Sequence, residues 1–325
     1  MTLEDRLRDW GAARGYGLAV ADIGVVETVR RKLEERRASG MIDAGFFEEN
    51  LTKFRYLEGA SITGPAWVVM LAVPSPISVL PVTIGSRTID TLIPPTYVRY
   101  NATFEDVLAD MKANALPTDV EAAVLKAPLK SLAVHMGLVV YGRNNITYRP
   151  GLGSGHQLCG YLVGTTLGTG ARPSDPRRPE TMLERCLNCR ACLRACPTGA
   201  IREDRFLIAA ERCFTLHSES HKPIPAWVRP PRSICLIGCM ACQQVCPENQ
   251  GRLKLVRSGM EFTAEETEAV IAVGRGLTLN GPGAGDVAKA RTNPAFVSAR
   301  TKFDDLGMSE DIEVMGRNLG YFLSL

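Results

Sequence analysis

Two groups of cysteines in the second half of the chain have the spacing that iron–sulfur chemistry needs. The first group ends just before Pro197 and consists of Cys186, Cys189, Cys192 and Cys196. The second ends just before Pro247 and consists of Cys239, Cys242 and Cys246. Each iron of a cubane cluster needs an outside ligand, and cysteines separated by two residues in a tight loop can present three thiolates. The sequence therefore predicts [4Fe-4S] clusters.

The position of each proline predicts how the ligands divide between two clusters. In bacterial two-cluster ferredoxins the cysteine before proline ligates the other cluster, and proline stops a helix from continuing at that point. One cluster is therefore expected on Cys186, Cys189, Cys192 and Cys246. The other is expected on Cys196, Cys239 and Cys242, together with one cysteine from outside both groups.

The remaining ligand is either Cys213 or Cys235. Cys213 is favoured, because the step from Cys235 to Cys239 is not a ferredoxin spacing. Cys235 and Cys159 would then be buried free cysteines. Two zinc sites are the alternative for this spacing, but two overlapping steps followed by C-x-x-x-C-P favour clusters. A disulfide framework is disfavoured, because the cysteines crowd into one segment of a long chain.

The composition indicates a globular chain of two or three units. It has 325 residues, of which 45% are hydrophobic and 22% charged, and its net charge of +3 is too small to indicate nucleic-acid binding. Residues 1–7 are charged and predict a capped helix, with Thr2 as N-cap and Asp5 completing a capping box. Charged residues follow Arg30-Arg31, where an export signal needs an apolar stretch. We therefore expect a cytoplasmic protein without a membrane segment.

The elements that must position this chemistry begin with alternating helices and strands. Helices are predicted over 2–14, 22–38, 104–115 and 118–136. Strands are predicted over 67–73, 79–84, 138–141 and 157–166. The run 67–73 is apolar throughout and ends at Pro74, which is typical of a strand buried on both faces. The alternation indicates an α/β domain.

Three successive segments are predicted, which gives an α/β fold class in the broad sense that includes α+β. They are an α/β cofactor-binding domain over 1–170, a bacterial double [4Fe-4S] ferredoxin-like domain over 176–250, and a short helical C-terminal region over 251–325. The Pro-rich connector 170–179 separates the first two. Residues 217–232 are expected to form a long loop. The last segment is predicted to be helical over 263–273, 284–291 and 309–323.

Longer stretches around these motifs resemble epoxyqueuosine reductases, which are cobalamin-dependent iron–sulfur enzymes related to reductive dehalogenases. The similar stretches are 211–225 and 237–249 around the cysteines, and 136–145 and Gly153-Ser154 ahead of them. The likeness extends over roughly residues 95–250. It implies that Cys213 is the isolated ligand of the second cluster.

The resemblance implies a corrinoid held by the α/β domain and reduced through the clusters. The residues implied to bind this cofactor are Arg99, Gly142, Arg143, Asn144, Ser154 and His156. Arg143 stands where the family usually has Lys, and His156 where aromatic residues are usual. Glu105, with Asp106 beside it, falls at the position of the family's proton-donating carboxyl, which in a dry pocket has a raised pKa. The alternative is that both acids simply occupy the start of a helix.

Two functions remain open from the sequence. One is a corrinoid-dependent reductase, with reduced ferredoxin or flavodoxin as electron donor and a modified nucleoside in tRNA, or another small molecule, as substrate. The other is an electron-transfer or activator protein that has no substrate of its own. The retained glycines favour the reductase, because they permit a large cofactor to approach the backbone closely. The altered surroundings of the acid and the last region, about 75 residues long, favour the second function.

Overall fold

The computed structural model describes residues 1–58, 62, 66–164, 182–204, 207–278, 281 and 283–323. The chain divides into two units: Met1–Ser75 with Asn101–Cys189, and Pro76–Tyr100 with Arg190–Leu325. This division differs from the three segments predicted from the sequence, because residues 76–100 belong with the C-terminal half. The connector predicted over 170–179 lies outside the described residues.

The first unit is built on a four-stranded sheet with the order β1-β2-β8-β5. Its strands are β1 (Gly17–Asp22), β2 (Trp67–Pro74), β8 (His156–Val163) and β5 (Ala122–Val124). Every neighbouring pair is antiparallel, and the central pair runs from Trp67 opposite Val163 to Pro74 opposite His156. The strand predicted over 67–73 is confirmed and is buried along both faces. The predicted mixture of helices and strands is confirmed, although the sheet is antiparallel and the two kinds of element do not strictly alternate.

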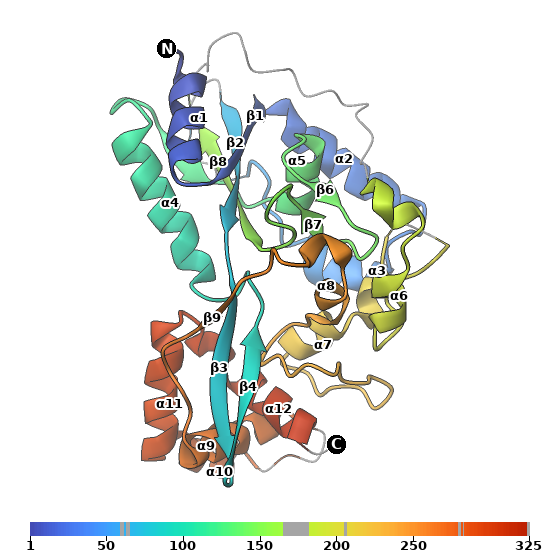
Figure 1. The fold of residues 1–325 in the computed structure, drawn as a ribbon, viewed down its shortest axis with the longest axis vertical. Coiled ribbons are helices and arrows are strands. Elements are labelled where there is room, and N and C mark those ends of the chain that lie inside the picture. The colour runs from blue at the N-terminus through green and yellow to red at the C-terminus, as the bar shows by residue number, and fades with distance from the viewer. Residues whose placement is uncertain are drawn as a thin grey trace. The chain divides into compact units, whose positions relative to one another are not determined.

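Helices cover both faces of this sheet (Figure 1). On one side, α1 (Leu3–Ala13) and α4 (Tyr100–Asn114) share an apolar core with Val69, Leu71 and Val73 of β2. On the other, α5 (Leu129–His135) packs against β2 and β8 and contacts α2 (Gly24–Ala38). The predicted capping box of α1 is confirmed, since the Asp5 N–H donates to Thr2 Oγ1 at 3.1 Å and the Thr2 N–H to Asp5 Oδ2 at 2.8 Å.

One helix predicted for this unit is wrong. Residues 118–136 form β5 and α5 rather than a single helix, and Pro128 is the N-cap of α5. A residue before proline is disfavoured in helical geometry, so the helix can begin only after Ala127. The residues ahead of it pair with β8, where Ala122 lies opposite Val163. The strand predicted over 138–141 shrinks to β6 (Val140–Tyr141), which pairs with β7 (Thr147–Tyr148).

The remaining elements of the first unit are short. They are α3 (Ala44–Phe46), a π-helical turn η1 (Phe47–Leu51) and a 3₁₀ turn η2 (Glu184–Leu187). The 3₁₀ turn carries Cys186 and lies close to β6, because the Leu183 N–H donates to the Tyr141 carbonyl oxygen at 2.8 Å. The first cysteines of the cluster segment are therefore attached to the β6–β7 hairpin.

The second unit has a three-stranded sheet with the order β4-β3-β9. β3 (Ile77–Ile84) and β4 (Arg87–Ile93) form an antiparallel hairpin, and β9 (Leu255–Arg257) runs parallel to β3. Gly85 forms the hairpin turn with a φ of 56°, in the region that favours glycine. The predicted strand 79–84 is confirmed within β3.

Short helices lie among the remaining cysteines of the second unit, and longer ones form its core. The short ones are α6 (Ala191–Ala195), η3 (Ala210–Arg212), α7 (Phe214–Glu219), α8 (Ala241–Gln244) and η4 (Pro247–Asn249). The later ones are α9 (Ala264–Gly274), η5 (Arg275–Leu277), α10 (Ala284–Arg291), α11 (Pro294–Asp305), η6 (Ser309–Asp311) and α12 (Ile312–Leu323). Apolar residues of the β3–β4 hairpin, α9, α11 and α12 form a common buried cluster. The loop predicted over 217–232 begins within α7.

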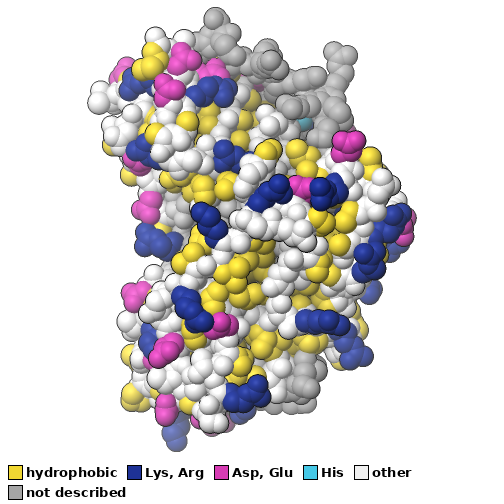
Figure 2. All heavy atoms as spheres, in the orientation of Figure 1, with side chains coloured by type: hydrophobic (Ala, Val, Ile, Leu, Met, Phe, Trp, Pro, Cys, Tyr) yellow, Lys and Arg dark blue, Asp and Glu magenta, His cyan; other side chains and the backbone are white. Residues whose placement is uncertain are grey.

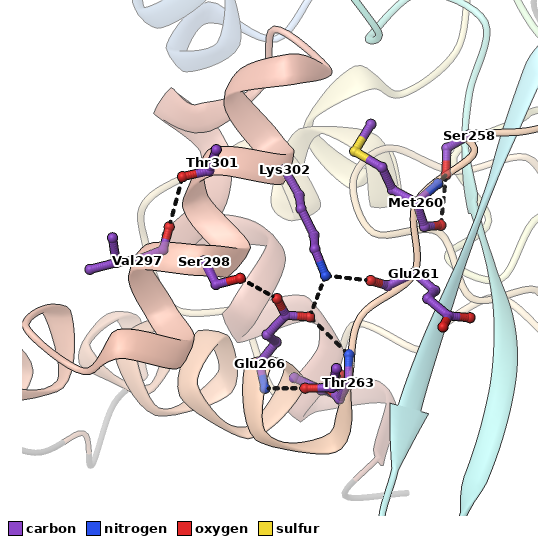
Figure 3. Close-up of polar contacts among 10 residues, drawn as sticks. Ser258, Met260, Glu261, Thr263, Glu266, Val297, Ser298, Thr301 and Lys302 are labelled. Carbon is purple, nitrogen blue, oxygen red and sulfur yellow. Dashed lines mark hydrogen bonds and ion pairs between the residues drawn. The ribbon is translucent and has the colours of Figure 1, made fainter.

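A buried carboxylate joins the start of α9 to α11. Glu266 completes a capping box with Thr263, as Figure 3 shows, and accepts hydrogen bonds from Ser298 Oγ at 2.6 Å and Lys302 Nζ at 2.7 Å. Lys302 Nζ also donates to the Glu261 carbonyl oxygen at 2.8 Å. These contacts stabilise the packing of α9 against α11, the two helices that share a buried cluster with α12.

The surface carries charges of both signs. Figure 2 shows Lys and Arg side chains interspersed with Asp, Glu and apolar side chains on the face drawn, in keeping with the small net charge of +3. Among the residues that the structure describes, none of the helices has the length and apolarity needed to span a bilayer.

Candidate functional site

Three predicted ligands of the second cluster lie near one another in the second unit. The thiols of Cys213 and Cys196 interact electrostatically, and the Cys239 thiol interacts with those of Cys235, Cys213 and Cys196. Burial raises the pKa of Cys239 to about 12 and also raises the pKa of Cys213. Cys242 lies on α8, which packs against α6, the helix that contains Cys192 and ends just before Cys196.

Backbone groups around these thiols suit a ligand that binds thiolates. The N–H groups of Thr215 and Ala241 donate to Cys213 and Cys239, which favours the charged form of each sulfur atom. Within the described ranges, no three or more His, Cys, Asp or Glu side chains are grouped so that they could hold a single metal ion. The gathered thiols with their N–H donors fit an iron–sulfur cluster, which takes one thiolate at each iron.

Cys235 is more deeply buried than Cys213, although its thiol also interacts with that of Cys239 and accepts a hydrogen bond from the Met240 N–H. Its side chain is fully buried in an apolar cluster with Ile77 and Met240, and burial raises its pKa to about 12. Cys159 is likewise fully buried, on β8, with a pKa raised by burial to about 12. Both have the environment of a buried apolar cysteine.

Arg143 connects the predicted cofactor segment to the first cysteine of the cluster segment. Its Nη2 donates to the carbonyl oxygen of Cys186 at 2.7 Å. Its Nε is buried and has no hydrogen-bond partner among the residues that the structure describes. A buried charged donor without a partner is unfavourable in a protein interior, so this atom suits a ligand that accepts hydrogen bonds.

The hairpin between β6 and β7 holds three of the predicted cofactor residues in a tight turn. A Cβ at Gly142 would lie 2.5 Å from Tyr148 and 2.6 Å from Asn144 Oδ1, so only glycine fits there. Asn144 is buried and donates from Nδ2 to the Tyr148 hydroxyl at 2.9 Å. Asn145 has a φ of 58°, a conformation that Asn tolerates better than most residues. Asn144 and Gly142 therefore shape the turn that presents Arg143.

Ser154 and His156 are buried just before and at the start of β8. The Nε2 of His156 lies 3.1 Å from Thr147 Oγ1, which fixes the ring against β7. Within the described ranges its buried Nδ1 has no hydrogen-bond partner, and burial lowers the pKa of His156 to about 4. The imidazole is therefore neutral at physiological pH.

The remaining predicted site residues are Glu105, Asp106 and Arg99. Glu105 and Asp106 are exposed on α4, so neither lies in a pocket that excludes water. Arg99 belongs to the second unit, is exposed and has a φ of 52°. Its N–H donates to the Leu306 carbonyl oxygen at 2.8 Å.

The sequence analysis missed a group of buried polar side chains beside Cys213 and Cys239. Ser218 of α7 and Asn318 of α12 are fully buried, and Arg317 is 3% exposed. Their signal in the sequence is an Arg-Asn pair inside the apolar stretch 312–323. Such a pair needs buried partners, and the sequence does not show which ones.

Comparison with known proteins supports the cluster interpretation. Residues 185–249 match the family described as 4Fe-4S double cluster binding domain. This range contains all eight predicted ligands, and the match supports two [4Fe-4S] clusters in the chain.

A curated relative extends the similarity. The epoxyqueuosine reductase of Synechococcus sp. (strain RCC307) is 36% identical over 137 residues, which are 40% of this chain and 37% of that protein. The chain spans less than two thirds of the length of the first curated relatives that it matches.

Solved structures share the fold along nearly the whole chain. The epoxyqueuosine reductase of Streptococcus thermophilus is 17% identical with a TM-score of 0.60, over 98% of this chain and 80% of that one. An epoxyqueuosine reductase solved with an epoxyqueuosine-modified tRNA stem loop is 18% identical with a TM-score of 0.58, over 95% of this chain and 82% of that one. The chain is therefore similar to epoxyqueuosine reductases in part of its sequence, contains a double-cluster segment and shares the fold of those enzymes along nearly its whole length.

Proposed function

We propose that this chain is an iron–sulfur reductase that passes electrons through two [4Fe-4S] clusters to a corrinoid and a bound substrate. The observation that carries the proposal is the hydrogen bond from Arg143 Nη2 to the Cys186 carbonyl oxygen. It joins the loop with the predicted cofactor residues to the loop with the first predicted cluster ligands. A short path between the two redox groups is what electron transfer to a cofactor requires.

The proposed ligands of the first cluster are Cys186, Cys189, Cys192 and Cys246, and those of the second are Cys196, Cys213, Cys239 and Cys242. The Cys239 thiol interacts with those of both Cys213 and Cys235, and the interaction of Cys213 with Cys196 supports Cys213 as the member of the second set. Reduced ferredoxin or flavodoxin is the proposed electron donor. Such donors and oxygen-sensitive clusters suit a reducing compartment, so we propose a cytoplasmic location.

The proposed corrinoid site lies in the first unit, around the β6–β7 hairpin and the start of β8. Arg143 and His156 each contribute a buried nitrogen atom that has no hydrogen-bond partner in the described part of the chain, and Gly142 leaves the turn without a side chain. When bound, a corrinoid supplies a strongly reducing cobalt centre, while the protein binds, orients and excludes water. The neutral His156 ring can accept or donate a hydrogen bond there without adding charge.

Glu105 remains the proposed proton donor, with Asp106 as its neighbour. Both are exposed on α4, so the proposal requires the bound substrate to cover them. A Glu105→Gln variant is expected to keep its iron and any corrinoid while its turnover falls by about 10²-fold or more. Unchanged turnover would remove Glu105 from the reaction.

Epoxyqueuosine in tRNA is the proposed substrate. Support comes from the relatives named epoxyqueuosine reductase and from the structure of one such enzyme with a modified tRNA stem loop. Removing an epoxide oxygen as water consumes two electrons and two protons, which fits a protein that receives electrons one at a time through clusters.

The test is anaerobic purification with iron, sulfide and cobalt analysis, followed by an absorption spectrum after cobalamin is added. We expect about eight irons per chain and a shifted cobalamin spectrum. An Arg143→Met variant should bind cobalamin more weakly, while an Arg55→Met variant on an exposed part of the same unit should not.

The exposure of Glu105 and Asp106 favours a second candidate, an electron-transfer or activator protein without its own substrate. About eight irons without any change in the cobalamin spectrum would select it over the reductase.

A further inference from the structure

The buried pair Arg317-Asn318 on α12 contacts the backbone that follows Cys213. Arg317 donates from Nη2 to the carbonyl oxygens of His217 and Ser218 at 2.9 and 3.1 Å. Its Nη1 donates to the carbonyl oxygens of Lys222, at 2.5 Å, and Ser220. A single guanidinium therefore binds four carbonyl groups within six residues of chain, a use of its rigid fork of donors that lysine cannot reproduce.

Asn318 connects this backbone to the segment that precedes Cys239. Its Nδ2 donates to the Ser218 carbonyl oxygen at 2.9 Å and to the Leu236 carbonyl oxygen at 2.8 Å. Its Oδ1 accepts from Arg317 Nη2 at 2.8 Å and from Nε at 3.2 Å. The amide thus bridges the two stretches of chain that carry Cys213 and Cys239.

The position of this pair is set by unusually close helix packing. A Cβ at Gly274 of α9 would lie 2.1 Å from the Arg317 backbone nitrogen, and one at Gly316 would lie 2.1 Å from the Val270 carbonyl oxygen. Because Gly274 and Gly316 have no side chains, the backbones of α12 and α9 can contact each other directly. Because the helices cannot separate without losing this contact, the Arg317-Asn318 pair is held at a fixed depth.

We infer that Arg317 and Asn318 are positioning residues of the second cluster, holding the Cys213 and Cys239 segments at the separation that the cluster needs. The inference rests on the proposed ligand set, in which both cysteines bind that cluster. Neither side chain touches the cluster in this role. Each acts through the backbone of residues 217–222 and 236, so α12 becomes part of the cluster site although it carries no ligand.

The test compares the iron content and the electron paramagnetic resonance spectrum of reduced, anaerobically purified variants. Arg317→Lys and Asn318→Ala are expected to lose about half the iron of the natural protein, as one of two clusters is lost. The remaining signal should match that of a Cys213→Ala variant, because the same cluster is missing. If Asn318→Ala yields no folded protein, Arg317→Lys, which keeps the charge, carries the test.

A matched control separates positioning from general stability. Met315→Ala removes a fully buried apolar side chain from the same helix and lowers the thermal midpoint without touching the pair. It is expected to keep both clusters. The inference is overturned if Arg317→Lys and Asn318→Ala keep both signals unchanged, or if Met315→Ala loses the same cluster at a similar midpoint. A Cys213→Ala variant with full iron would instead refute the ligand set.

Discussion

The backbone N–H of Gly238 donates to Oγ of Ser218 at 2.9 Å. Ser218 belongs to α7, which begins directly after Cys213, and Gly238 immediately precedes Cys239. Gly238 has a φ of 71°, and a Cβ there would lie 2.6 Å from the Tyr97 hydroxyl oxygen. This hydrogen bond therefore links the segments that carry two predicted cluster ligands, Cys213 and Cys239. The turn at Gly238 is one that only glycine can form without strain.

A Ser218→Ala variant should be destabilised by about 1–3 kcal/mol, because the buried Gly238 N–H loses its acceptor. Chemical denaturation of the anaerobic protein measures the change. Ser233→Ala is the control, since Ser233 is only partly buried and its hydroxyl donates to the Gln244 side chain. A Ser218→Ala protein as stable as the natural one would mean that another group accepts from Gly238.

Cys213→Ala should lose about half the bound iron, and Cys235→Ala should lose none. The thiols of Cys213 and Cys235 both interact with that of Cys239, but Cys213 also interacts with Cys196, whereas Cys235 is fully buried in an apolar cluster. Iron and sulfide analysis after anaerobic purification gives the answer. Equal losses from both variants, or a loss confined to Cys235→Ala, would reverse the assignment.

The ion pair between Glu266 and Lys302 should contribute measurably to the stability of the second unit. Glu266→Gln is expected to destabilise by about 1–3 kcal/mol, because its hydrogen-bond partners lose a charged acceptor. Lys302→Met should cost less, since its side chain is 27% exposed against 6% for Glu266. A double-mutant cycle by urea denaturation measures the coupling, expected at about 1 kcal/mol. Additive effects would show that the two residues act independently.

The ion pair between Arg14 and Asp110 should make the folding stability depend on pH in the acidic range. The hydrogen bonds from Arg14, including Nη2 to Oδ1 at 2.7 Å, hold the pKa of Asp110 below its usual value. A carboxyl with a lowered folded pKa stabilises the fold fully above its unfolded pKa of about 3.9 and loses that contribution as pH falls through the folded pKa.

Urea denaturation of the natural protein and Asp110→Asn at several pH values measures this dependence. The two should differ by about 1 kcal/mol at neutral pH, and the difference should shrink below about pH 4. Asp9→Asn, at an exposed position of α1, is the control. A difference that stays constant across this range would exclude ionisation of Asp110 as its source.

Several features of the protein could be predicted from short stretches of sequence. The cysteine spacing identified the clusters, because ligands two residues apart must share a loop. Thr2 and Asp5 predicted the start of α1, since a capping box involves only neighbouring residues. The apolar run 67–73 predicted a buried strand for the same reason.

Elements whose identity depends on distant partners were predicted less well. Residues 118–136 have helical character, but Ala122–Val124 pair with β8 about forty residues later. Residues 76–100 were assigned to the first segment, yet Leu80, Val82 and Ile93 share a core with α9, α11 and α12. No local pattern specifies which apolar surface a hairpin will cover.

The sequence by itself determined the chemistry of this protein, because thiolate ligands at fixed short spacing restrict the group that they can bind. Only the tertiary structure decided what supports that chemistry. It brought Cys213 and Cys239 together through Ser218, and it buried Arg317 and Asn318 against carbonyl groups about a hundred residues earlier in the chain. The physical reason is that a buried polar side chain must find its partners in space, and these partners are distant in sequence.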